Sequence, residues 1–411
     1  MNQVLSDISA LPEFAARCPV NSTMSSYLRK WLSSPQLQLQ VCACIMLGNL
    51  ARSDEVCEEF VQKSRIHKPL MDILATATDS QVLFSAIGFL KNLALPARNK
   101  VELGNADIIE ILPRLWAMDT LPQIQYSAIS LARQLLIGNF ANVLRISAPL
   151  SADPDSPANE KSRLSVLISI FGRSDAEPVR MEIARALAAV CRVLAARAPA
   201  PGTDIATLEK RRRELFERHR DIGTPLSFLV SQTKWPVVRS EGWFVLALLA
   251  RTEEGVQCVA DIMHEIDVFT PLMDLMTGKT FIERMSSPMT SPTEATSSLL
   301  AELMTAKADG QGSGGAAKAG TTKEAEMARI DRENALVLVS ELLRRRGSTM
   351  AFMRRIAFEE LLQDGGSLHV ENLAIEAASP PPPPLPLTQT SSESSFMMDS
   401  VMGDSNHEMF N

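Results

Sequence analysis

Apolar residues recur with a helical period along most of the chain, and the pattern repeats. A leucine followed three residues later by Leu or Ile marks five places, namely Leu70, Leu112, Leu164, Leu226 and Leu272. A small residue stands sixteen positions after three of these leucines, at Ala86, Ala128 and Gly242, and Ala43 opens the same motif one repeat earlier. A repeat of roughly 40–47 residues with helical periodicity is typical of the HEAT and armadillo class. The pattern therefore predicts an all-α, armadillo/HEAT-like right-handed helical solenoid, in which stacked units bury a common core.

Breaks in this pattern predict five segments. The array loses its register after 277, where Pro288 stands in place of a small helical residue, and 310–320 is rich in glycine. We predict an N-terminal helical lead-in or partial repeat at 1–36, the repeat array at 37–277, a flexible linker at 278–322, helices capping the array at 323–363, and an acidic, proline-containing disordered tail at 364–411.

The N-terminal segment is too apolar to serve as the polar cap that a solenoid end requires. Its apolar residues are Leu5, Ile8, Leu11, Phe14, Tyr27, Leu28 and Trp31. We therefore expect this end of the chain to expose apolar surface.

Composition narrows the choice of function. Aromatic residues make up 5% of the chain, which disfavours an all-β fold. The net charge of −7 argues against a protein that binds nucleic acid by bulk charge. The longest apolar run, Trp243–Ala250, is far shorter than the roughly 20 residues of a spanning helix, so we expect no stable membrane insertion. The six cysteines form no disulfide framework, and reduced thiols of a cytoplasmic protein are the expectation.

No catalytic constellation stands out in the sequence. The five histidines share no metal-ligand spacing, and the glycine-rich stretch at 310–320 lacks the Gly-Lys-Ser/Thr of a phosphate loop. We therefore expect a non-catalytic binding protein with no metal and no cofactor.

Three amides share one position of the long repeat helix and form what we call the amide ladder: Asn49, Asn92 and Gln134. Each follows the small residue of its repeat by six positions. In an armadillo array this helix lines the concave face, where an amide can bond a partner's backbone without adding charge. The alternative is that these amides bond one another or loop carbonyls.

Two further features have a binding interpretation and a structural one. The acidic cluster, comprising Asp54, Glu55, Glu58 and Glu59, either caps a solvated helix or receives a basic segment of a partner. The proline run Pro380–Pro384 either binds an SH3-like partner or serves as an extended spacer.

Three stretches of the chain resemble a known family. They are VCACIMLGNLAR at 41–52, SAIGFLKNLALPARNK at 85–100 and PQIQYSAISLARQLLI at 122–137. Together they resemble the C-terminal half of the armadillo-repeat GDP-dissociation stimulators of small GTPases, the SmgGDS type. The similarity covers roughly 37–277.

The resemblance implies a guanine nucleotide exchange factor and chaperone for Rho- or Rap-type GTPases, with a small GTPase of the Rho, Rap or Ras type as its partner. It implies that the G domain is held in the concave groove and that Asn49 and Ser53 contribute to that site. Two alternatives remain. One is a generic armadillo scaffold or adaptor without exchange activity. The other is a nuclear-import carrier, disfavoured because Ile45 and Gly88 stand where such carriers place tryptophan.

Overall fold

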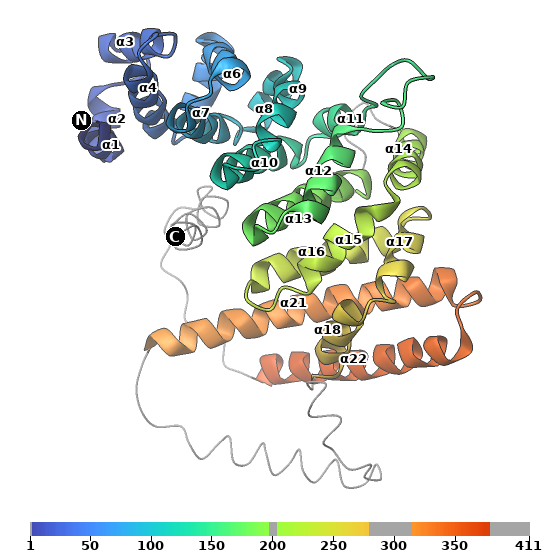
Figure 1. Ribbon diagram of the computed structural model, residues 1–411. Helices are drawn as coiled ribbons and strands as arrows, with labels where there is room; N and C mark the ends of the chain where they lie inside the picture. The colour runs from blue at the N-terminus through green and yellow to red at the C-terminus, as the bar shows by residue number, and fades with distance from the viewer. Residues whose placement is uncertain (1, 197–203, 279–314, 379–411) are drawn as a thin grey trace. The chain divides into compact units, whose positions relative to one another are not determined.

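The computed structural model describes residues 2–196, 204–278 and 315–378 of the chain (Figure 1). The chain folds as two compact units, the first extending to Pro225 and the second beginning at Leu226. Within the described residues all regular structure is helical, apart from a single bridge between Pro149 and Ser162. The prediction of an all-α fold is thus confirmed. No helix among the described residues has both the length and the apolar composition needed to cross a bilayer.

In the first unit, one or more shorter helices precede each of the long helices α4, α7, α10 and α13. Its helices are α1 (Asn2–Ala10), α2 (Pro12–Arg17), α3 (Thr23–Trp31), α4 (Leu37–Leu50), α5 (Asp54–Glu58), the π-helix η1 (Glu59–Lys63), α6 (His67–Thr76), α7 (Ser80–Leu93), α8 (Ala97–Asn105), α9 (Ile108–Trp116), α10 (Pro122–Leu136), α11 (Phe140–Ser147), α12 (Arg163–Arg173), α13 (Glu177–Leu194), α14 (Ile205–Arg218) and the 3-10 turn η2 (Arg220–Ile222). The long helices carry the repeat: α1 packs on α4, α4 on α7, α7 on α10, and α10 on α13 (Figure 1).

The second unit is built on two long helices. After α15 (Gly223–Val230), which spans the boundary between the units, come α16 (Pro236–Ala250), α17 (Gly255–Ile262), α18 (Ile266–Thr277), α21 (Gly315–Arg346) and α22 (Phe352–Ala378). Helix α21 packs against α16, α17 and α18, and α22 packs against α18 and α21. The ring of Phe269 on α18 meets that of Phe358 on α22 edge to face, with centroids 5.8 Å apart.

The structure corrects the predicted end of the linker. Helix α21 begins at Gly315, so 315–322 is helical rather than irregular. The alanines at 316, 317 and 319 are strong helix formers and outweigh the neighbouring glycines. Residues 279–314 lie outside the described part of the chain.

The predicted start of the tail is also wrong, because α22 continues through 364 to Ala378. Gly365 lies within α22 and is a point of close packing. A Cβ at this position would lie 2.6 Å from Cε of Met276 on α18, so a larger residue here would displace the end of that side chain. The rest of the tail, including the proline run Pro380–Pro384, lies outside the described residues.

The prediction that the N-terminal end exposes apolar surface is confirmed. Val4, Ile8, Leu11 and Tyr27 are each 46–59% exposed. Among the other apolar side chains of this end, Leu28 on α3 is buried. Apolar surface of this kind marks a place where another surface can pack.

A buried ion triad ties α10 to α13. Nε of Arg133 donates to Oε1 of Glu182 at 2.6 Å, and Arg185 lies 3.4 Å from the other carboxylate oxygen. Burial on its own would raise the pKa of Glu182, but the charges of Arg133 and Arg185 lower it to about 2. Removing one member of such a triad leaves an uncompensated buried charge, so these residues specify how the two helices pair.

A buried histidine fastens the end of the first unit to the start of α12. The ring nitrogens of His219 lie 3.1 Å from Oγ of Ser162 and 3.3 Å from Oγ of Ser165, and these two serines form the capping box of α12. The His219 side chain is buried, and desolvation, reinforced by the charge of Arg218, lowers its pKa to about 4.

We predict that His219 makes the stability of the chain fall in mild acid. Because its folded-state pKa lies below the unfolded value of about 6.5, the unfolded chain binds the extra proton between these values. Its contribution is therefore complete above pH 6.5 and is lost as the pH falls toward 4, by about 3 kcal/mol. Urea unfolding at several pH values should show this slope in the natural chain and lose it in His219→Gln. An unchanged slope in the variant would contradict the prediction.

Candidate functional site

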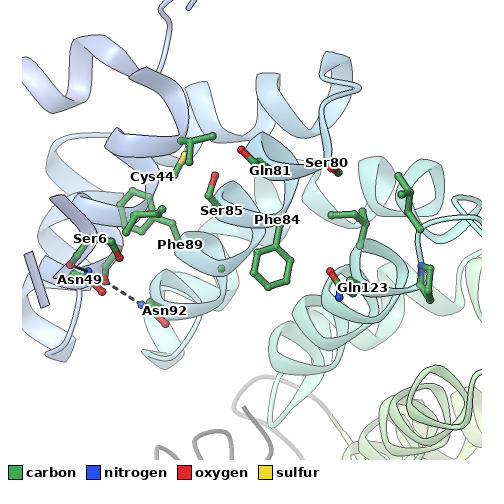
Figure 2. Close-up of a pocket in the computed structure, with 17 residues that line it drawn as sticks. Ser6, Cys44, Asn49, Ser80, Gln81, Phe84, Ser85, Phe89, Asn92 and Gln123 are labelled. Carbon is green, nitrogen blue, oxygen red and sulfur yellow. Dashed lines mark hydrogen bonds between the residues drawn. The ribbon is translucent and has the colours of Figure 1, made fainter. Parts of the chain in front are cut away.

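A groove of about 750 Å³ runs across the inner side of the first unit, between α1, α4, α7 and the start of α10 (Figure 2). Its lining residues are Ser6, Val41, Cys44, Ile45, Gly48, Asn49, Ser80, Gln81, Phe84, Ser85, Gly88, Phe89, Asn92, Leu121, Pro122, Gln123 and Ile124. We refer to this set as the groove.

The groove is uncharged. None of its 17 lining residues is Asp, Glu, Lys, Arg or His, although such charged residues other than His make up 22% of the chain. Its polar groups are the hydroxyls and amides of Ser, Asn and Gln, and its apolar surface is aliphatic and aromatic. Such a surface binds through buried area and directional hydrogen bonds rather than through net charge.

Asn49 lies on the groove wall and contacts α1. Its Nδ2 donates to Oγ of Ser9 at 2.9 Å and to the carbonyl oxygen of Ser6 at 3.4 Å. Arg52, just after α4, also donates to the carbonyl oxygen of Ala10 at 2.8 Å, so this region holds the C-terminal half of α1. Helix α1 therefore forms part of the groove and occupies the amide nitrogen of Asn49.

Asn92 repeats this contact one helix further along. Its Nδ2 donates to the carbonyl oxygen of Gly48 on α4 at 3.0 Å (Figure 2). The amide nitrogens of Asn49 and Asn92 thus bond the preceding helix, which is the structural alternative for the amide ladder. Among the described residues nothing donates to the Oδ1 of either side chain, so each asparagine keeps an acceptor that a partner can use.

Gln134, the third member of the amide ladder, is not part of the groove. It is 8% exposed and lies near the end of α10, whereas α10 contributes to the groove through its first residues, Pro122, Gln123 and Ile124. The structure therefore brings together two of the three ladder residues.

Ser53 and the acidic cluster lie beyond the groove, around α5. Ser53 is the N-cap of α5, its hydroxyl accepting from the backbone amide of Val56, and Asp54 and Glu55 are exposed in the first turn. Glu58 pairs with Arg98 at 3.3 Å, and Glu59 lies 3.8 Å from Lys63. The capping interpretation accounts for these contacts, since acidic side chains stabilise the first turn of a helix.

Two residues of the groove, Phe84 and Gly88, were not predicted as site residues. The Phe84 ring is 53% exposed and extends from α7 toward Gln123 (Figure 2). One turn later, a Cβ at Gly88 would meet nothing within 4 Å, so the floor beside the ring is open. An exposed Phe cannot be told from a core Phe by periodicity alone, but a glycine four positions before a ladder asparagine is a usable signal.

A second pair of asparagines, Asn99 and Asn142, is fully buried and purely structural. Asn99 Nδ2 donates to the carbonyl oxygen of Leu93 at the end of α7, and Asn142 Nδ2 donates to those of Leu135 and Lys100. The two asparagines stand 43 positions apart, which again matches the repeat. The carbonyls of Leu93 and Leu135 stand at helix ends and have no partner within their own helix, whereas that of Lys100 lies inside α8.

The groove shows no equipment for covalent chemistry. Burial raises the pKa of the Cys44 thiol to about 12, so the sulfur stays protonated and is a poor nucleophile at neutral pH. In the described part of the chain no group of His, Cys, Asp and Glu is arranged to hold a metal ion.

Comparison with known proteins places this groove in context. No protein-family model matches the chain. The Rap1 GTPase-GDP dissociation stimulator 1-A of Xenopus laevis is 28% identical over 109 residues, which cover 26% of this chain and 18% of that protein. The GTPase-GDP dissociation stimulator vimar of Drosophila melanogaster is 32% identical over 90 residues, which cover 21% of this chain and 14% of that protein. The aligned part thus spans less than a fifth of the length of these curated relatives.

The solved structures define the class of fold. A designed armadillo repeat protein matches with a TM-score of 0.50 at 16% identity, covering 77% of this chain and 98% of that chain. The chain is therefore an armadillo-type helical solenoid. Its resemblance to the GDP-dissociation stimulators, indicated by residues 41–137, is confirmed at low identity.

We predict that the two asparagine pairs differ in their effect on stability. Asn142→Ala leaves the buried carbonyl of Leu135 without a partner and removes a second bond to that of Lys100, and it should lower the free energy of unfolding by about 2–3 kcal/mol. Asn92→Ala should cost about 1 kcal/mol, because water from the groove can reach the carbonyl of Gly48. Urea denaturation of the two variants measures this difference, and equal losses would contradict it.

Proposed function

We propose that the chain is a non-catalytic regulator of small GTPases that binds the G domain in the groove. The observation that carries the proposal is the uncharged groove with two asparagine acceptors, Asn49 and Asn92, at the same repeat position. The relatives named as stimulators of GDP dissociation support the class of partner. We further propose exchange-factor or chaperone activity toward Rho- or Rap-type GTPases in the cytoplasm.

Binding would rest on three kinds of contact. The free Oδ1 atoms of Asn49 and Asn92 would accept from backbone amides of the partner, each bond contributing about 1 kcal/mol. The exposed ring of Phe84 would pack against an apolar side chain of the partner, with room for it above Gly88. Asp54 and Glu55, exposed on α5, would attract a basic tail, and Ser53 would lie at the edge of that contact.

Nucleotide release needs no catalytic side chain in this scheme. A regulator that binds the nucleotide-free or distorted GTPase more tightly than the GDP form shifts the equilibrium by that difference in affinity. The buried Arg133–Glu182–Arg185 triad stiffens the unit that carries the groove, so the partner rather than the solenoid would deform.

We predict that a bulky side chain at position 88 blocks the partner. Gly88→Tyr places a ring in open groove space and should weaken GTPase binding at least about tenfold without unfolding the chain. Titration calorimetry with GDP-loaded and nucleotide-free Rho- and Rap-type GTPases measures the effect.

Gly172→Tyr is the matched control. A Cβ at Gly172 also meets nothing within 4 Å, but this glycine lies on α12, outside the groove, so binding should change less than about twofold. Equal affinity of the two variants would place the partner elsewhere. If the natural chain bound no form of the GTPase, the generic scaffold would be favoured. If it bound a GTPase without speeding the release of labelled GDP, only the proposed exchange activity would be contradicted.

We also predict a direct role of the asparagine acceptors. Asn49→Ala should lower GTPase affinity by about 1–3 kcal/mol, or roughly 5- to 150-fold, beyond any loss of stability. Thermal unfolding and affinity must be measured on the same variant, because Asn49 also holds α1 through Ser6 and Ser9. Intact affinity in a destabilised variant would show that Asn49 serves the fold only.

A further inference from the structure

The turn between α21 and α22 in the second unit combines basic and hydroxyl residues. Arg344, Arg345 and Arg346 end α21, and Gly347, Ser348 and Thr349 follow at once. Both hydroxyl residues are exposed, and the turn joins the ends of the two long helices (Figure 1). We call residues 344–349 the arginine turn.

The two hydroxyls of the arginine turn differ in their hydrogen bonding. Oγ1 of Thr349 donates to the carbonyl oxygen of Arg346 at 3.0 Å. The hydroxyl of Ser348 bonds to no described residue. Ser348 therefore presents a free nucleophilic oxygen, two and three residues after Arg346 and Arg345, whereas Thr349 would first have to break a bond.

The arginines of the turn also have a structural task. Arg345 bonds the carbonyl oxygen of Arg251 and lies 3.1 Å from the carboxylate of Glu253, and Arg346 bonds the side chain of Gln257. These contacts tie the end of α21 to the connection between α16 and α17. The tie to Glu253 is weak, since that side chain is 87% exposed and water screens the pair.

We propose that Ser348 is the phosphate acceptor of an arginine-directed protein kinase, and that the phosphate withdraws Arg345 and Arg346 from Glu253 and Gln257. Kinases choose substrates by charge pattern, and two arginines shortly before an exposed serine suit a kinase with acidic pockets. Gly347 adds no side chain between the arginines and the acceptor. Its added Cβ would lie 2.4 Å from the carbonyl oxygen of Leu343, so the tight turn itself requires glycine.

The transfer step is ordinary phosphoryl transfer. The Ser348 oxygen attacks the γ-phosphorus of ATP, and ADP leaves with the electron pair of the broken P–O bond. The hydroxyl proton passes to the kinase's catalytic carboxylate and then to water. The co-reactants are Mg-ATP and the kinase.

The product changes the local balance of charge. A phosphoserine carries a charge of about −1.5 to −2 and three strong acceptors, and it pairs best with arginine. At the C-terminal end of α21 the helix dipole disfavours an anion, so the phosphate needs the guanidinium groups close by. In this proposal Arg345 and Arg346 turn to the phosphate and give up Glu253 and Gln257, which loosens α17 from α21.

The first test is phosphorylation of the full chain with the catalytic subunit of cyclic-AMP-dependent protein kinase and Mg-ATP. Peptide mass spectrometry should place phosphate on Ser348 in the natural chain and in Thr349→Ala, and none in the 347–353 peptide of Ser348→Ala. Arg346→Ala should slow this modification by about tenfold, and Arg344→Ala, whose partner Glu341 lies on its own helix, by less than about twofold. An unmodified 347–353 peptide, or phosphate on Thr349 instead, would overturn the proposal.

The second test addresses the consequence. Hydrogen exchange of residues 251–262 should be about fivefold faster in the phosphorylated chain than in the unmodified one, while α22 changes little. Ser348→Ala treated with kinase and ATP should exchange like the unmodified chain. Unchanged or slower exchange of 251–262 after phosphorylation of Ser348 would disprove the withdrawal of the arginines.

Discussion

The carbonyl groups at the ends of the long helices govern how each unit is assembled. The last turn of an α-helix leaves carbonyls without a partner, and an unpaired buried carbonyl costs about 1–3 kcal/mol. Here side chains from later in the chain bond them. Such contacts are Asn92 to Gly48, Asn99 to Leu93, Asn142 to Leu135, Arg212 to Leu194, Arg345 to Arg251 and Arg332 to Leu275. The C-terminal end of each of these helices is therefore bonded by an element that follows it in the chain.

The same requirement explains the asparagines at helix ends of the first unit, which act there beside charged side chains such as Arg114 and Arg212. An amide can close a helix end without bringing a charge into the interior, whereas an arginine needs water or a carboxylate as well. The groove keeps this uncharged character, and its asparagines still have an oxygen to offer. The two atoms of one side-chain amide can thus serve different purposes. In Asn92 the nitrogen bonds the carbonyl of Gly48, and the oxygen is left for a partner in the groove.

The sequence predicted the helical class and the shared position of Asn49 and Asn92, because both follow from periodicity. It grouped Gln134 with them, since a repeat position does not reveal which part of the next helix lines the groove. It also ended α22 too early, because the acidic composition after 363 does not show that the helix continues to pack on α18 and α21. Phe84 was missed because burial of an aromatic ring depends on neighbours that the pattern does not contain.

The absence of charge from the groove lining also sets the kinetics of any complex formed there. A neutral surface does not draw a partner from a distance, so encounter at the groove itself would proceed at unassisted rates of roughly 10⁵–10⁶ M⁻¹s⁻¹. Differences between competing partners would then appear in how long each stays bound, because the residence time depends on how completely the partner displaces water from the groove and packs into it. Discrimination at such a site is by shape, and the bare helix surface at Gly88 is where a misfitting side chain would be rejected or a fitting one retained.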